Sequence, residues 1–346
     1  MTIEKSTNPQ QLAIWLFVCS ALVFSMVVLG GVTRLTRSGL SMVNWSPIMG
    51  VVPPLSKESW QKTFNKYKKF PEYKKINKGM SLDEFKSIYW FEFNHRLLGR
   101  LISLAFFIPF LYFLVRRTIP PGHIPKLILM PILGGLQGLL GWYMVKSGLV
   151  DKPSVSPYRL TAHLALAFIT YVYIFWVALS YWYQDRTSVA PANKRYRLFA
   201  WVLTLLISVM ILSGGFVAGT KAGFVFNTFP LMNGKLLPSG YLAMKPMLIN
   251  FFENVATVQF NHRWLGLIVA TTIAVFWFSV QTKLQARNTM MAVHLLLAMV
   301  IVQVTLGITT LLLNVPVTLA ASHQGGALLL LTIMLYINHR LRPARD

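Results

Sequence analysis

Two copies of one histidine motif contain the residues of this chain that are best suited to chemistry. FEFNHRLLGR covers residues 91–100 and VQFNHRWLGL covers residues 258–267, with Phe-Asn-His-Arg identical in both. Three residues before the histidine, the first copy has Glu92 and the second has Gln259. Neutral imidazole is a good ligand for iron, copper and zinc. A carboxylate can accept a proton or stabilise positive charge. The copies therefore share a candidate metal ligand and differ in their only acid–base group.

Two further histidines occupy matching places later in each half of the chain. QGLLGWYMVKSGL, from Gln137, resembles QVTLGITTLLLNV, from Gln303, and each precedes a histidine, in TAHLALA and ASHQGGA. Two imidazoles on different helices at one depth are how a helix bundle holds haem, whereas zinc commonly takes three or four ligands. We predict one bis-histidine haem site per half, formed by His95 with His163 and by His262 with His323. A simple hydrogen bond to a neighbour is the interpretation kept for His294.

The residues around the histidines suggest that the two sites differ in role. Arg96 and Arg263 directly follow their histidines, and a guanidinium suits the carboxylates of haem propionates. Glu92 and Arg96 are also four residues apart, which is ion-pair spacing on a helix; both interpretations stay open. Glu92 lies on the helical face of His95, so we expect it near the edge of a haem held there. This predicts a reactive first site and a second site that only holds its haem, unless Glu92 merely pairs with Arg96.

Long apolar stretches must carry these residues. Hydrophobic residues make up 55% of the 346 residues and charged residues 12%. About 20 mostly apolar residues cross a membrane as a helix, because backbone groups in lipid need partners within the segment. Eight stretches qualify: Leu12–Val32, Leu97–Val115, Leu127–Val145, Leu160–Tyr183, Leu198–Ala218, Trp264–Val280, Met290–Leu313 and Leu319–Ile337. The sequence predicts an all-α integral membrane protein.

Charge sets the expected orientation. Basic residues gather in the short connections 116–126, 186–197 and 283–287 and in the C-terminal tail. The positive-inside rule therefore puts both termini in the cytoplasm and the four paired histidines toward the outer side. The net charge of +23 follows this pattern, so no nucleic-acid partner is expected. The loop Thr33–Phe91 disagrees, with eleven Lys/Arg against four Asp/Glu on the outer side. We interpret its run KYKKFPEYKKINK as a solvated face, with attraction to anionic lipid or propionates as the alternative.

Internal similarity divides the chain in two. Segments from Gly30 and Gly214, which both begin Gly-Gly, precede the two histidine motifs. We expect four helices in residues 1–185 and four in residues 186–346, with a histidine opening the second and fourth helix of each. Four crossings return the chain to its starting side, so the halves are parallel repeats related by a pseudo-twofold axis along the membrane normal. The lone cysteine, Cys19, allows no internal disulfide.

Taken together, the eight helices, Glu-x-x-His-Arg in the first half and the matched histidines resemble the haem A synthase family. That resemblance implies oxidation of the C8 methyl of haem O to a formyl group through an alcohol. It also implies that His95 and His163 frame the substrate, that Glu92 is the catalytic carboxylate, and that His262 and His323 hold a resident haem b. The chain lacks the cysteine pair that some members carry in the first outer loop and looks like the cysteine-free branch of proteobacteria and mitochondria.

The first residues, MTIEKSTNPQQ, resemble neither a transit peptide nor a cleaved signal, so a bacterial inner membrane is the expected location. Membrane lipid and an unidentified redox partner are expected there. The resemblance implies a haem O synthase (a farnesyltransferase) and terminal-oxidase assembly factors as further candidate partners. The main alternative function is a non-enzymatic di-haem b electron carrier between a quinol and an outer acceptor. A two-repeat transporter ranks third, because the sequence lacks helices broken at mid-depth.

Overall fold

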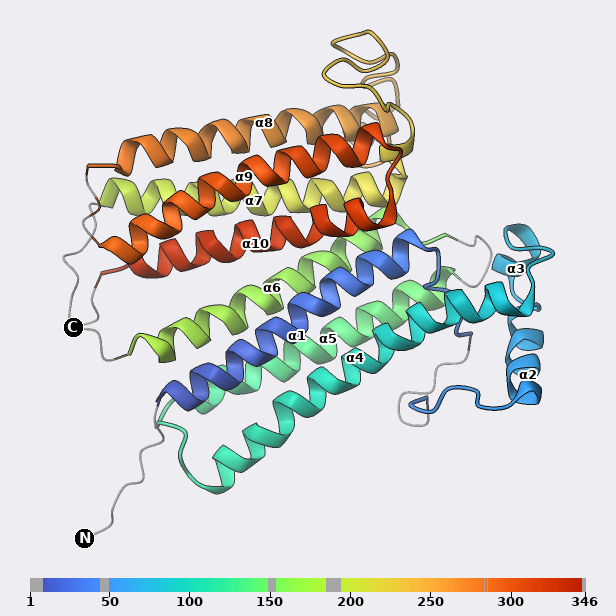
Figure 1. The fold of residues 1–346 in the computed structure, drawn as a ribbon, viewed down its shortest axis with the longest axis horizontal. Coiled ribbons are helices and arrows are strands. Elements are labelled where there is room, and N and C mark those ends of the chain that lie inside the picture. The colour runs from blue at the N-terminus through green and yellow to red at the C-terminus, as the bar shows by residue number, and fades with distance from the viewer. Residues whose placement is uncertain are drawn as a thin grey trace.

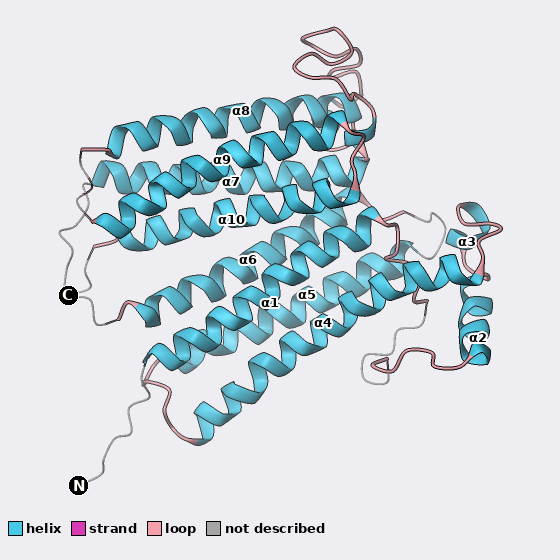
Figure 2. Cartoon of the chain, viewed as in Figure 1, coloured by secondary structure: helices cyan, strands magenta, loops and turns pink. Residues whose placement is uncertain are grey.

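Eight long helices make up most of the computed structural model, which describes residues 9–43, 50–148, 154–184, 194–282, 284 and 286–343. Each is long and apolar enough to cross a membrane, which confirms the all-α, multi-pass prediction. Figure 2 draws no strand in the described part of the chain. The eight are α1 (Pro9–Leu35), α4 (Leu82–Val115), α5 (Ile124–Gly148), α6 (Pro157–Trp182), α7 (Lys194–Thr220), α8 (Val255–Val280), α9 (Arg287–Leu312) and α10 (Val317–Leu341).

The helices pack as two groups of four, seen as the upper and lower layers of Figure 1. In the first group, α1 packs on α4 and α6, and α5 packs on the same two helices. In the second, α7 packs on α8 and α10, and α9 packs on the same two. The groups meet through α1 with α10, α6 with α7, and α6 with α10. In both groups the first and third helices in chain order pack on the second and fourth, as parallel repeats would. The duplication itself and its symmetry axis stay predictions.

Several helices extend well past the apolar stretches that predicted them. α4 begins at Leu82 rather than Leu97, because the Ser81 hydroxyl caps the Glu84 amide and the Glu84 carboxylate accepts from the Ser81 amide in return. α8 likewise begins at Val255, after the cap residue Asn254. The expectation that histidines open the even helices was therefore wrong: His95 lies more than three turns inside α4. Hydropathy finds the part of a helix in lipid and misses its polar extension.

A small cap covers the extended start of α4. The helices α2 (Lys57–Tyr67) and α3 (Pro71–Lys75) pack on α4 through an aromatic cluster. Its buried members are Trp60, Phe64, Tyr67, Phe85, Tyr89 and Phe93. The Tyr67 and Phe85 rings stack with centroids 5.0 Å apart. The basic run predicted as a solvated face is thus only partly solvated, because Tyr67 and Glu72 inside it are buried.

The structure does not describe all of the basic residues on which the orientation prediction rests. Arg186, Lys283 and Arg345 lie outside the described residues. The side of the membrane on which each terminus lies therefore remains a prediction.

Candidate functional site

Each of the four paired histidines packs against a glycine of a neighbouring helix. The pairs are Gly30 with His95, Gly141 with His163, Gly214 with His262, and Gly307 with His323. A Cβ added at Gly141 or Gly307 would lie only 2.9 Å from a ring carbon of the facing histidine. Each glycine lies within two turns of the C-terminal end of its helix. All four histidines therefore lie toward the same end of the bundle, called the histidine end below.

The glycine contacts place His95 and His163 in the first group of helices and His262 and His323 in the second. That each pair binds one haem stays a prediction. A glutamine on the neighbouring helix fixes the second histidine of each pair. The Gln303 amide donates to the His323 carbonyl at 2.8 Å and contacts a ring nitrogen at 3.1 Å. Gln137 does the same for His163, with distances of 3.1 and 3.3 Å.

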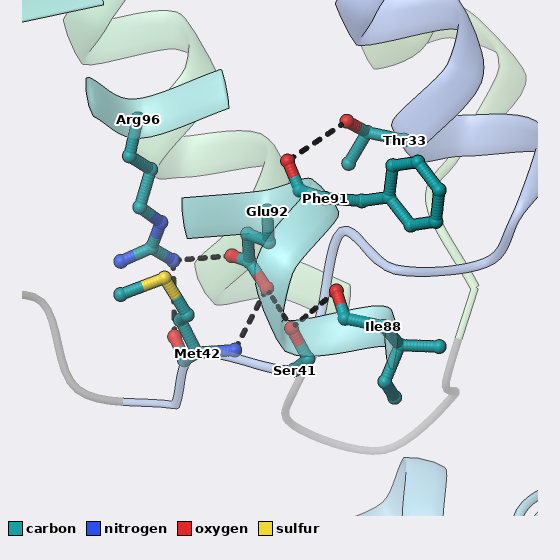
Figure 3. A network of polar contacts seen from close by, with 7 residues as sticks. All are labelled: Thr33, Ser41, Met42, Ile88, Phe91, Glu92 and Arg96. Carbon is teal, nitrogen blue, oxygen red and sulfur yellow. Dashed lines mark hydrogen bonds and ion pairs between the residues drawn. The ribbon is translucent and has the colours of Figure 1, made fainter. Parts of the chain in front are cut away.

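The carboxylate of Glu92 is buried beside the first pair and held from three directions (Figure 3). Arg96 donates to its Oε1 at 2.5 Å, forming the predicted i,i+4 ion pair. The Ser41 hydroxyl and the Met42 amide each donate to Oε2 at 2.7 Å. Arg96 also donates to the Met42 carbonyl at 3.0 Å. Charge-assisted hydrogen bonds of this length are strong, so the carboxylate is fixed in position and its negative charge is stabilised.

Gln259, in the matching place on α8, has a neutral network of the same design. Its amide donates to the carbonyls of Ala222 at 2.9 Å and Phe226 at 3.3 Å. Arg263 donates to the Phe226 carbonyl at 2.6 Å, to the Thr228 carbonyl at 2.8 Å and to Gln259 Oε1 at 3.3 Å. Both arginines therefore tie a connecting loop to the helix, but only Arg96 does so through a carboxylate.

A serine adds a second difference between the sites. The Ser213 hydroxyl lies 2.6 Å from His262 Nδ1, and this contact leaves Nε2 as the ring nitrogen available to a ligand. Leu29 occupies the matching position before Gly30 in the first half and has no hydroxyl. Outer hydrogen bonds of this kind orient metal-ligating histidines. The second site therefore has a ring fixed by a hydroxyl where the first has an apolar neighbour.

The remaining histidines have ordinary partners. Trp277 Nε1 donates to His294 Nδ1 at 2.9 Å, which confirms the hydrogen-bonded interpretation of His294. His123 Nδ1 lies 2.9 Å from the Tyr181 hydroxyl. His339 Nε2 lies 3.4 Å from the Ser180 hydroxyl.

The donor set fits haem better than a metal ion held by side chains alone. His163 Nδ1 is buried and has no hydrogen-bond partner in the described part of the chain, so that nitrogen is available as a ligand. The facing glycines allow each ring to pack directly on the backbone of the neighbouring helix. Among the described residues, no group of three or more His, Cys, Asp or Glu side chains could hold a metal ion. Two imidazoles per site are the ligands that a planar haem needs.

Several residues of the site were missed by the sequence analysis. Ser41 and the Met42 amide hold Glu92 from a loop whose course no periodicity predicts. Ser213 shares no pattern with the first half. Gln137 and Gln303 were visible, because they begin the two matched segments, but spacing alone gave them no role.

The comparisons with known proteins agree on one family. The family described as "Cytochrome oxidase assembly protein" matches residues 13–335. The "Heme A synthase" of Nitrosospira multiformis is 54% identical over 342 residues, covering 99% of this chain and 96% of that protein. That of Parvibaculum lavamentivorans is 44% identical over 340 residues, covering 98% and 97%. "Heme A synthase COX15" of Arabidopsis thaliana is 48% identical over 340 residues, covering 95% of this chain and 74% of that protein.

Proposed function

We propose that this chain converts haem O to haem A, because it belongs to the family of cytochrome oxidase assembly proteins that includes the haem A synthases. The reaction oxidises a methyl on the substrate ring to a formyl group by way of the alcohol. One observation carries the assignment beyond family membership. At the first of the two proposed histidine sites the buried carboxylate of Glu92 lies one helical turn from His95, and among the described residues the matching place of the second site has the amide of Gln259. An electron carrier with two equivalent haems has no need of that difference.

The first pair, His95 and His163, is proposed to hold the substrate haem. Glu92 then lies one helical turn from His95, at the edge of the ring. Removing hydrogen from a ring methyl develops positive charge at that edge, and a fixed negative charge nearby stabilises it. The carboxylate can also take up a proton leaving the methyl or position water. Arg96, Ser41 and Met42 keep the carboxylate in place through these steps.

The second pair, His262 and His323, is proposed to hold a resident haem b. Haem b supplies one-electron transfer when it is bound. The side chains around this pair position the histidine and provide no acid–base group. Ser213 orients His262, and Gln259 has an amide where the first site has a carboxylate. Arg263, like Arg96, is proposed to face a propionate of its haem.

The location and organisation follow the same reasoning. We infer a bacterial inner-membrane protein with cytoplasmic termini and the histidine end on the periplasmic side. Residues 1–185 form the substrate half and residues 186–346 the haem b half. A haem O synthase is the expected source of substrate, and terminal-oxidase assembly factors are the expected recipients.

Pigment extraction from purified variants tests this assignment. Wild-type protein should carry haem b together with haem O, haem A or the alcohol. His323→Ala should lose haem b, whereas His95→Ala should keep haem b and lose the other pigments. His294→Ala is the matched control and should keep both. Haem b as the only pigment, two equivalents per chain, would instead establish the di-haem carrier.

A further inference from the structure

The loop Lys221–Asn254, which joins α7 to α8, exposes most of its large apolar side chains. Leu248 is 74% exposed, Leu236 66% and Met247 61%. Leu237, Phe224 and Leu231 are exposed as well. An apolar surface of this kind on a loop marks a place that contacts another apolar phase.

Polar groups form the interior of this loop. Asn250 is fully buried; its amide donates to the Met244 carbonyl at 2.7 Å and the Met247 carbonyl at 2.9 Å, and its oxygen accepts from the Met244 amide. Asn254 donates to the Gly240 carbonyl and to Asn250, both at 2.8 Å. Because side-chain amides satisfy the backbone from within, the loop keeps its shape without an apolar core. Leu236, Met247 and Leu248 are therefore held outward by a defined fold.

The position of the loop identifies the apolar phase. In Figure 1 it projects sideways from the histidine end of α8, away from the other half of the bundle. Trp264 and Ile268 of α8, the helix that follows the loop and is long and apolar enough to span the membrane, are exposed as well. Tyr241 packs edge-on to Phe260 at 5.0 Å, and aromatic side chains of this type favour the level of lipid headgroups.

Charge separates this loop from its counterpart in the first half. Residues 221–254 contain three lysines and one acidic residue, whereas Thr33–Phe91 contains eleven Lys/Arg and four Asp/Glu. A few lysines beside apolar side chains suit contact with lipid phosphates, because each long stem lets the ammonium reach the headgroups. The first-half loop instead folds as a cap over its own aromatic cluster.

We propose that the loop Lys221–Asn254 is a membrane-interface anchor, with the exposed side chains of Leu236, Leu237, Met247 and Leu248 inserted among the phospholipid acyl chains at the histidine end. The anchor has a direct link to the second histidine site. Carbonyls of the same loop, those of Phe226 and Thr228, accept from Arg263. Contact of the loop with lipid therefore stabilises the carbonyls that position Arg263 next to His262.

Single cysteines in nanodiscs of phosphatidylcholine and phosphatidylglycerol test the anchor. The native thiol is first removed by Cys19→Ala, which changes one buried residue of α1. Leu237→Cys and Leu248→Cys are then labelled with an environment-sensitive fluorophore. Ile268→Cys on α8 is the lipid-facing control, and Gln61→Cys, at an exposed position of α2, is the aqueous control. Haem b content confirms that each variant is folded.

Two quenchers distinguish lipid from water: doxyl-labelled lipid quenches labels in the bilayer, and iodide quenches labels in water. Labels at 237 and 248 should be quenched by doxyl-labelled lipid at least half as strongly as the label at 268. They should be several-fold less sensitive to aqueous iodide than the label at 61. Strong iodide quenching at both loop positions would mean that the loop lies in water. Protection from both quenchers would mean that a protein covers it, and either result overturns the anchor. Neither result bears on the proposed reaction, since the labelled positions lie outside both histidine pairs.

Discussion

Glu72, in the cap over α4, should make the stability of that cap depend on pH. Its carboxyl is 5% exposed, and the Tyr67 hydroxyl donates to it at 3.2 Å. The two ion pairs found among the described residues involve other carboxylates. Burial raises the pKa of Glu72 to about 7; the Tyr67 hydrogen bond opposes this rise, and the charge of Glu92 adds to it. The folded cap therefore favours the protonated form of Glu72.

The sign and size of the effect follow from that shift. A carboxyl whose pKa is raised from 4.5 to about 7 binds more protons when folded than when unfolded between those values. Stability is therefore lost as pH rises from about 4.5 to about 7, and the full penalty applies above pH 7. At about 1.4 kcal/mol per pKa unit, the penalty is roughly 3 kcal/mol. Glu72→Gln removes the charge, so the variant cap should be more stable than wild type at pH 8 and nearly equal to it at pH 5.

Hydrogen exchange measured by mass spectrometry on peptides from α2 and α3 reports the opening of the cap. Comparing variant and wild type at one pH cancels the intrinsic effect of pH on exchange. Glu72→Gln should slow exchange by up to about 10²-fold at pH 8 and by only a few-fold at pH 5. Glu58→Gln, which removes an exposed carboxylate of α2, should act alike at both pH values. Equal exchange of Glu72→Gln and wild type at pH 8 would mean that ionisation of Glu72 does not destabilise the cap, contrary to this prediction.

Three further outcomes are expected. Gly307→Ala should weaken or shift the haem b spectrum, because its Cβ would lie 2.9 Å from the facing histidine ring; Gly134→Ala, where a Cβ meets nothing within 4 Å, is the control and should match wild type. Ser213→Ala removes a 2.6 Å hydrogen bond to a proposed haem ligand and should weaken haem b retention about 10-fold, measured by haem loss to apomyoglobin; unchanged loss would mean that the serine orients nothing. Reporter fusions after Pro71 and after Lys194 should fall on opposite sides of the membrane, and a shared side would contradict the proposed orientation.

The sequence predicted the parts of the molecule that depend on simple periodicity or duplication. The eight spans follow from apolar length, because a bilayer fixes how much apolar helix is needed. The glycines packed on the four histidine rings lie in the segments that match between the two halves, whereas the pairing of His95 with His163 around one haem stays a prediction.

Other features depend on contacts that composition does not encode. The start of α4 at Leu82 depends on a capping box of polar residues, which hydropathy cannot distinguish from a loop. The burial of Glu72 inside a basic run depends on α2 and α3 folding back on Phe85. The hydrogen bonds to the Glu92 carboxylate come from Ser41 and Met42, which lie some fifty residues earlier in the chain and contact α4 only in the folded protein. Tertiary contacts across such distances leave no periodic signal.

The catalytic role of Glu92 is tested most directly by supplying haem O to membranes that contain Glu92→Gln and resolving the pigments by chromatography. The variant loses the charge that pairs with Arg96, so haem A formation should fall about 10²–10³-fold while haem b content stays normal. Ser41→Ala, which keeps the carboxylate and removes one of its donors, should retain most activity. Gln259→Glu added to Glu92→Gln should restore nothing, because the second pair is proposed to hold haem b and not the substrate. Wild-type haem A output from Glu92→Gln at matched protein level would contradict the account and leave Glu92 as a structural partner of Arg96.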